Sequence, residues 1–232
     1  ALNYAISQAK DRTPTRTLSA AAVDIGGRTL TPGVYSVGSS LAITGILKLD
    51  AQGDADAAWI FQIGSTLGTA AASKVEIINL PKGSMSGDHV WCGSRQVGTS
   101  ATIGATSTVL GSIMATASIT TGAGSATGPL LANIGAVTLG AGAIVNTDNK
   151  CEKVYPPAPD NPLDTFVVIG DACKFAVLGG SAVTGAATAT IGATSAILGS
   201  IMVNSSITTG AGSITGPLLV NAGFVTLGAG AV

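Results

Sequence analysis

The sequence predicts a β-solenoid, a fold in which the chain winds into stacked coils of short strands. Residues 102–144 and 190–232, offset by 88 positions, share 33 identities over 43 aligned positions. Such self-similarity is typical of repeat architectures. Within each copy a Thr recurs every 18 residues, which suits one coil. No Asp, Glu, Lys or Arg occurs from 96 to 147 or from 175 to 232, so both copies carry an uncharged pattern.

The 18-residue period locates the expected strands. In the first copy the recurring Thr lies in SATIGA, SITTGA and AVTLGA. The residues on either side of it are mostly apolar, so alternation points them into the core and the Thr outward. Stacking the coils then produces a ladder of exposed threonines. Its members in the two copies are Thr102, Thr120, Thr138, Thr190, Thr208 and Thr226.

A second run, residues 109–115, also alternates and predicts a second outer face. That face carries Leu110, Ser112, Met114, Thr127 and Leu131. Exposed Met and Leu side chains would be costly in water, so we expect something to cover this side. An amphipathic helix at the N-terminus is the natural cover. The residues that indicate this helix are Leu2, Tyr4, Ala5, Gln8 and Ala9.

Composition excludes several classes of function. The chain has 232 residues, 46% of them hydrophobic and 10% charged, with a net charge of −1. A near-neutral chain without a basic cluster is not expected to bind nucleic acid. A membrane-spanning helix needs about 20 consecutive apolar residues, but Gly, Thr or Ser interrupts the apolar runs every few positions. We therefore expect no nucleic-acid partner and no membrane insertion.

No constellation of catalytic or metal-binding residues stands out. Glycoside chemistry, which some β-helix enzymes perform, needs paired carboxylates, and neither repeat copy has any. His89 is the sole histidine and is interpreted as structural. Asp50, Asp54 and Asp56 lack the Gly and the distal Glu of a calcium loop, so an Asx-rich turn is the better interpretation. We expect no enzyme, no metal and no cofactor.

Three stretches carry a resemblance to a known family. They are LTPGVYS at 30–36, LAITGILKLDAQGDADAAWIFQIGSTL at 41–67, and the Thr-rich coils at 99–145. They closely resemble the microbial ice-binding (antifreeze) proteins, which are built on a discontinuous β-solenoid. The resemblance runs from the N-terminal helix to about Val145. It implies a mainly β fold: a right-handed β-solenoid with three-sided coils and one α-helix packed alongside.

The order of segments departs from that family. FAVLGGSAVT at 175–184 is similar to the start of the family's N-terminal coil, which in the family precedes the helix. A circular permutation, or a window cut across tandem copies, would explain this order. We expect a single domain over 1–232, with helix and coils in 1–146, a linker in 147–165 and further coils in 166–232.

The linker holds four Pro and most of the charge of the second half of the chain. Cys151 and Cys173 lie on either side of the four Pro. Two states are open for the three cysteines. Either these two form a disulfide, or all three cysteines, Cys92 included, are reduced and buried. An odd cysteine count gives no firm framework.

The resemblance implies ice binding, with thermal hysteresis and inhibition of ice recrystallisation. An uncharged row of rigid Thr side chains suits that function independently. The alternative is an extracellular structural or adhesive module without ice activity. For ice binding we expect a secreted monomer whose partner is the ice surface. The predicted ice-binding residues are Ser100, Thr102, Ser118, Thr120, Ala136, Thr138, Thr188, Thr190, Ser206, Thr208 and Thr226.

Overall fold

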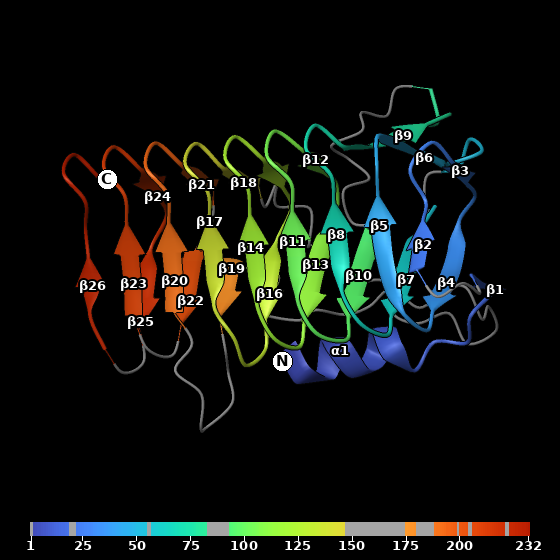
Figure 1. Ribbon diagram of the computed structural model, residues 1–232, viewed down its shortest axis with the longest axis horizontal. Helices are drawn as coiled ribbons and strands as arrows, with labels where there is room; N and C mark the ends of the chain where they lie inside the picture. The colour runs from blue at the N-terminus through green and yellow to red at the C-terminus, as the bar shows by residue number, and fades with distance from the viewer. Residues whose placement is uncertain are drawn as a thin grey trace.

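The computed structural model describes residues 2–18, 22–54, 57–82, 93–146, 175–179, 188–198, 200–203, 206–220 and 223–232. The chain winds into coils stacked along the long axis of the molecule, with one short helix beside them (Figure 1). Three sheets, A, B and C, run the length of the stack, and all their strand pairs are parallel. In each sheet the strand number rises by three from one strand to the next, so each coil gives one strand to each sheet.

Sheet A has nine strands. In spatial order they are β1 (Arg16–Thr17), β4 (Gly33–Val37), β7 (Trp59–Ile63), β10 (Gly93–Val97), β13 (Ser112–Ala115), β16 (Leu130–Ala132), β19 (Phe175–Gly179), β22 (Ser200–Val203) and β25 (Leu218–Val220).

Sheet B also has nine strands. They are β2 (Ala22–Asp24), β5 (Ser40–Ile43), β8 (Leu67–Thr69), β11 (Ala101–Ile103), β14 (Ile119–Thr121), β17 (Val137–Leu139), β20 (Thr188–Ile191), β23 (Ser206–Thr209) and β26 (Val225–Thr226).

Sheet C has eight strands. They are β3 (Thr29–Leu30), β6 (Ile46–Asp50), β9 (Lys74–Ile78), β12 (Thr108–Val109), β15 (Ala126–Thr127), β18 (Ile144–Asn146), β21 (Ala196–Leu198) and β24 (Ile214–Thr215). The predicted solenoid with three-sided coils is confirmed.

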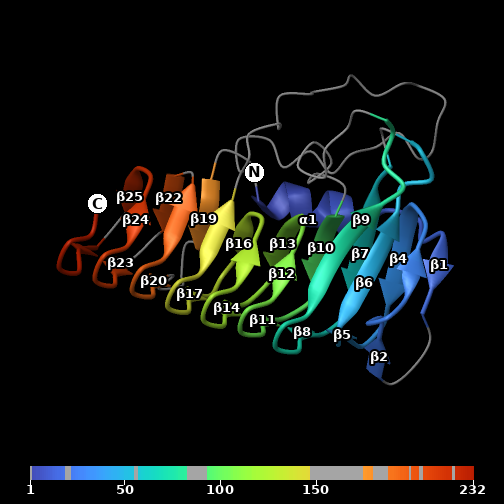
Figure 2. The same ribbon diagram turned by 90° about the horizontal axis from the view of Figure 1, so that it is seen from above.

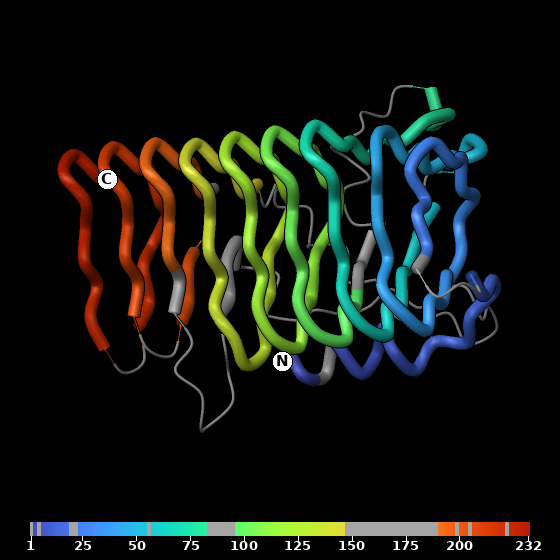
Figure 3. Tube along the Cα trace, viewed as in Figure 1, coloured from blue at the N-terminus to red at the C-terminus, as the bar shows by residue number. Residues whose placement is uncertain are grey.

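The described strands after residue 174 extend the same three sheets. β16 pairs with β19, β17 with β20 and β18 with β21. The later strands lie at the end of the stack opposite β1, β2 and β3 (Figure 3). The predicted linker and all three cysteines lie outside the described residues, as do His89 and Asp56. The disulfide therefore stays a prediction.

The helix α1 (Leu2–Lys10) lies along the outside of sheet A (Figure 2). Leu2 and Ala9 are buried in one apolar cluster with Met114 and Leu131, both of which are 0% exposed. At the C-terminal end of the helix, the two N–H groups of the Gln62 amide are shared among the carbonyls of Ala9, Lys10 and Arg12, at 2.9, 3.1 and 2.7 Å. The expectation that a helix covers Met114 and Leu131 is confirmed.

The prediction that Leu110, Ser112, Met114, Thr127 and Leu131 share one outer face is wrong. Gly111 has a φ of +87°, and there the chain turns a corner between β12 in sheet C and β13 in sheet A. Ser112 and Met114 therefore lie on sheet A, whereas Leu110 lies at the corner. Thr127 is 5% exposed and pairs with Val109 and Val145, in the inward row of sheet C. The alternation of side chains between inside and outside holds only within one strand, so it does not carry across the corner at Gly111.

The core changes character along the stack. At the β4–β7 end it holds large aromatics: Tyr35 and Phe61 stack with centroids 5.4 Å apart, and Trp59 donates to the Leu30 carbonyl at 3.1 Å. In the 18-residue coils Ile, Val, Leu and Ala fill the inside instead. Shorter coils enclose less volume, so smaller side chains fill them at normal packing density.

Candidate functional site

The outer face of sheet B carries the predicted Thr ladder, named the Thr row below. Register places Thr102 beside Thr120, Thr120 beside Thr138, Thr138 beside Thr190, Thr190 beside Thr208, and Thr208 beside Thr226. All are exposed except Thr138, which is half-buried. Their flanking residues point inward: Ala101, Ile103, Ile119 and Val137 are at most 1% exposed. The row is continuous although 52 positions separate Thr138 from Thr190.

The residues two positions earlier on each strand form a second row beside the Thr row, named the Ser row, and most of them are small and polar. Its members are Ser40, Thr66, Ser100, Ser118, Ala136, Thr188, Ser206 and Phe224. The side chains join across strands at one end, where the Thr66 hydroxyl donates to the Ser40 hydroxyl at 2.8 Å. The Thr188 side chain lies outside the described part of the structure, although its backbone pairs with Ser206. Phe224 is 82% exposed and interrupts the row at its far end.

A row of glycines forms the third line of the face. A Cβ on Gly122 would lie 2.4 Å from the backbone nitrogen of Ala105 in the neighbouring coil, closer than real Cβ atoms come. Gly104, Gly140, Gly192, Gly210 and Gly228 make equally close approaches. The next corner adopts a left-handed conformation in successive coils, at Thr106, Gly124 and Gly142. The repeated TGAGS segment is therefore required by backbone contact and by the turn.

Buried serines fasten this corner from inside. The Ser73 hydroxyl donates to the Ile43 carbonyl at 2.8 Å, Ser107 donates to Ala70 at 2.8 Å, and Ser195 donates to Gly140 at 3.1 Å. Each bond joins one coil to its neighbour. Buried hydrogen bonds of this kind, together with β-branched side chains that are restricted at χ1, make the face rigid.

Among the described strands of sheet B, the first one, β2, carries a charged residue, Asp24. Asp24 occupies the position in register with Ala42 and, through it, with the Thr row. Its carboxylate accepts from the backbone nitrogens of Gly26 at 2.8 Å and Thr44 at 3.0 Å. These bonds, chiefly the one from Gly26, lower the pKa of Asp24. The carboxylate thus caps the first coil, and the uncharged face begins at β5.

Sequence periodicity missed the first part of the face. Ala42 and Gly68 continue the Thr row, because Ala42 pairs with Gly68 and Gly68 with Thr102. These coils are longer: Leu41 pairs with Leu67, 26 residues on, and Leu67 pairs with Ala101, 34 residues on. A fixed period of 18 could not find them. The alternation in LAIT and LGTA, which matches ATIG, is the signal that could have done so.

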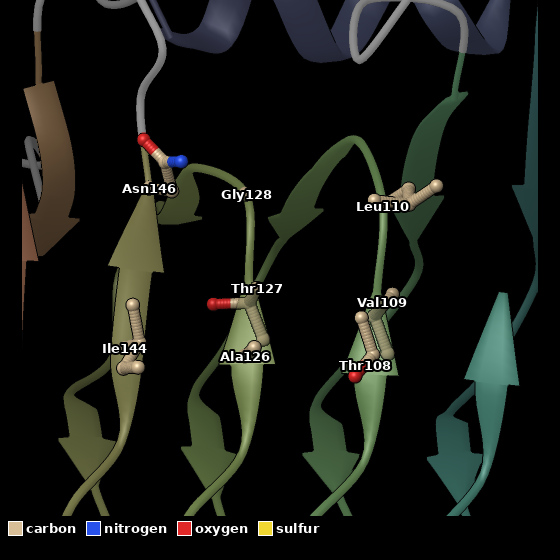
Figure 4. A pocket seen from close by; sticks show the side chains of 8 residues that line it. All are labelled: Thr108, Val109, Leu110, Ala126, Thr127, Gly128, Ile144 and Asn146. Atoms are coloured by element: carbon tan, nitrogen blue, oxygen red, sulfur yellow. The ribbon is translucent and has the colours of Figure 1, made fainter. Parts of the chain in front are cut away.

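The other two faces have different character. The described part of sheet A lies under α1 between β4 and β16, with apolar side chains between. Sheet C carries Lys48, Lys74 and Glu76 at one end, with a Lys74–Glu76 ion pair at 2.7 Å. Farther along it has a shallow hollow of about 190 Å³ lined by Leu110, Ala126 and Ile144 among others (Figure 4). Sheet B is the face that is both uncovered and uncharged over most of its length.

The described residues offer little for other chemistry. Among them no group of three or more His, Cys, Asp or Glu side chains could hold a metal ion. Asp50 accepts from the Gln52 backbone at 2.9 Å and from the Asn79 amide at 2.8 Å, which confirms the predicted Asx turn. In the same part of the chain no helix has the length and apolar character needed to cross a membrane.

Comparison with known proteins agrees with this geometry. Residues 1–145 match the model of the Ice-binding-like family. An ice-binding protein of Nostoc sp. (strain HG1) is 44% identical over 147 residues, which cover 61% of this chain and 51% of that relative. The chain therefore spans about half the length of this relative.

Solved structures show the same fold. An ice-binding protein from an Antarctic biological consortium superposes with a TM-score of 0.54 at 36% identity, covering 62% of each chain. The ice-binding protein of the Antarctic ascomycete Antarctomyces psychrotrophicus gives a TM-score of 0.54 at 30% identity, over 61% of this chain and 66% of that one.

Proposed function

We propose that this chain, which belongs to the Ice-binding-like family, adsorbs to ice through the outer face of sheet B. The contact residues are the eleven predicted from the sequence, all of which lie in the Thr row or the Ser row, extended by Ala42, Thr66 and Gly68. Adsorption of this kind produces thermal hysteresis and inhibits recrystallisation. The observation that carries the proposal is the Thr row itself: threonines in strict register across six adjacent strands, on the uncovered face.

The physical case rests on spacing, rigidity and charge. Neighbouring strands lie about 4.7–4.9 Å apart, so the row presents methyl and hydroxyl groups at a regular, near-crystalline interval. Restricted χ1 angles and fastened corners mean that little conformational entropy is lost when the face meets a solid. Charged groups hold water in arrangements that do not match an ice lattice. From β8 to β26 the described face has no charged residue.

The kind of protein that matches also supports a binding function over an enzymatic one, because the matching family and relative are ice-binding proteins. We further propose that residues 1–232 act as one ice-binding unit and that the protein works outside the cell, where ice forms. A structural or adhesive module is the competing function. It would share the fold but would not require an uncharged Thr row to stay uncovered.

Thermal hysteresis and recrystallisation measurements on the purified chain separate the two functions. Ice binding predicts a gap between melting and freezing points that grows with protein concentration, together with small ice grains after annealing. A non-ice-binding protein at equal concentration is the control. If the chain behaves like that control while circular dichroism shows folded β structure, the ice-binding proposal is wrong and a structural or adhesive module is favoured.

A further inference from the structure

Some inward positions of sheet B hold threonine, although their neighbours in the core are apolar. Thr121 and Thr209 are each 3% exposed, and register sets them beside Ile103 and Ile191. Thr69 occupies the same inward position on β8 and is half-buried. Burying a hydroxyl group costs free energy unless the group forms a hydrogen bond. These side chains do not belong to the Thr row, so their presence in the core has another cause.

Each inward Thr accepts a hydrogen bond from the glycine row of the next coil. In every case the donor is a glycine N–H and the acceptor is the Thr hydroxyl. The bonds are Gly104 to Thr69 at 2.9 Å, Gly140 to Thr121 at 3.3 Å, and Gly228 to Thr209 at 3.1 Å. The glycine row is the third line of the outer face of sheet B, so a buried side chain holds the backbone of that face.

Coils with an apolar residue at the inward position hold the glycine row differently. The Gly122 N–H donates to the backbone carbonyl of Ile103 at 2.7 Å. Gly140 combines both arrangements, because its N–H also donates to the Thr121 carbonyl at 2.9 Å. The Thr hydroxyl is therefore an additional acceptor, and its position inside the core decides how far the glycine is drawn toward the solenoid axis.

Thr69 belongs to a longer chain of hydrogen bonds at the start of the Thr row. Its hydroxyl accepts from Gly104 and donates to the Ser107 hydroxyl at 3.4 Å, and Ser107 donates to the Ala70 carbonyl at 2.8 Å. These bonds cross between the coil of β8 and the coil of β11. Gly104 lies two positions after Thr102 and directly follows β11. Its height above the core therefore sets the tilt of the strand end that carries Thr102.

We propose that Thr69, Thr121 and Thr209 are positioning residues of the ice-binding face. Their buried hydroxyls keep the glycine row level with the Thr row, and they do not touch ice themselves. The inference rests on the proposed function of this face. Thr69 should matter more than Thr121, because the Gly140 N–H keeps the Thr121 carbonyl as a second acceptor.

The test compares Thr69→Val with wild type by thermal hysteresis at equal concentration and by melting temperature. Valine keeps the branched shape of threonine but removes the acceptor, which leaves the Gly104 N–H without its partner. We expect a loss of hysteresis in Thr69→Val, a smaller loss in Thr121→Val, and recovery in Thr69→Ser.

Thr15→Val is the matched control for stability. The Thr15 hydroxyl also accepts from a backbone N–H, that of Val34 at 3.0 Å, but it lies beside sheet A. This variant should lower the melting temperature and keep the hysteresis of wild type. A purely structural role for Thr69 predicts the same behaviour from both variants, so equal hysteresis in Thr69→Val and Thr15→Val overturns the proposal.

Hydrogen exchange measured by NMR gives a second reading that does not need ice. The Gly104 amide should exchange faster in Thr69→Val than in wild type, whereas the Gly122 amide, bonded to the Ile103 carbonyl, should not change. Unchanged exchange at Gly104 overturns the proposal. A wild type without hysteresis overturns the proposed function of the face instead, and exchange at Gly104 then still shows whether the Thr69 hydroxyl holds the glycine row.

Discussion

The outer faces of sheets A and B are built from the same coils at the same period, yet they have opposite surroundings. On sheet A the outward positions hold Met114 and Leu131, which α1 buries completely. On sheet B the outward positions hold Thr120 and Thr138, over which no described helix lies. A solenoid gives every face a regular repeat, so regularity alone does not identify a functional face. What distinguishes the binding face is that its side chains are small and polar enough to stay uncovered.

The largest expected effect on stability comes from removing a side chain on the covered face. Met114→Ala should lower the free energy of unfolding by about 2–5 kcal/mol, because it empties a fully buried site between sheet and helix. Thr120→Ala, on the open face, should cost about 1 kcal/mol or less. Denaturant unfolding of both variants measures the difference. Equal losses would mean that the two faces are not distinguished by burial.

A smaller loss is expected from adding a methyl group to the glycine row. Gly122→Ala places a Cβ 2.4 Å from a backbone nitrogen, so the coils must separate, at a cost of about 1–3 kcal/mol. Thermal hysteresis should fall as well, since the Thr row next to it loses its even spacing. Gly68→Ala is the matched control, because a Cβ at that position would have no atom within 4 Å. Similar melting temperatures for the two variants would contradict this role of the glycine row.

Filling the gap in the Thr row should improve function with little change in stability. Gly68→Thr introduces a β-branched side chain into open space, in register between Ala42 and Thr102. We expect higher thermal hysteresis at equal concentration and an unchanged melting temperature. Thr69, the next residue, faces inward and donates toward Ser107, so Thr69→Ala should not raise activity. A decrease in hysteresis for Gly68→Thr would place the contact surface elsewhere.

The smallest effect concerns the charge at the end of the face. Because hydrogen bonds lower the folded-state pKa of Asp24, the ionised carboxylate stabilises the fold above its ordinary pKa of 3.8, and this contribution is lost as pH falls through the lower folded value. Asp24 is mostly exposed, so solvent screening keeps the contribution small. The drop in melting temperature from neutral to acidic pH should be slightly smaller for Asp24→Asn than for wild type. An identical pH dependence would show that the cap contributes nothing.

Much of this arrangement could be predicted from the sequence, and the failures have physical causes. The Thr row from Thr102 onward follows from period and alternation, and the need for a cover over Met114 and Leu131 follows from their hydrophobicity. The corner at Gly111 could not be predicted, because alternation restarts on each side of a turn. Ala42 and Gly68 were missed because the longer coils around them break the 18-residue period.

One comparison tests the central claim most directly: thermal hysteresis of Thr120→Tyr measured beside Ile144→Tyr. Thr120 is exposed in the middle of the Thr row, whereas Ile144 is 46% exposed on sheet C. The ring at 120 should stand above the flat face and abolish most of the hysteresis, while melting temperatures of both variants stay near wild type. Full hysteresis in Thr120→Tyr, with loss in Ile144→Tyr, would contradict the account and move the ice-binding face to sheet C.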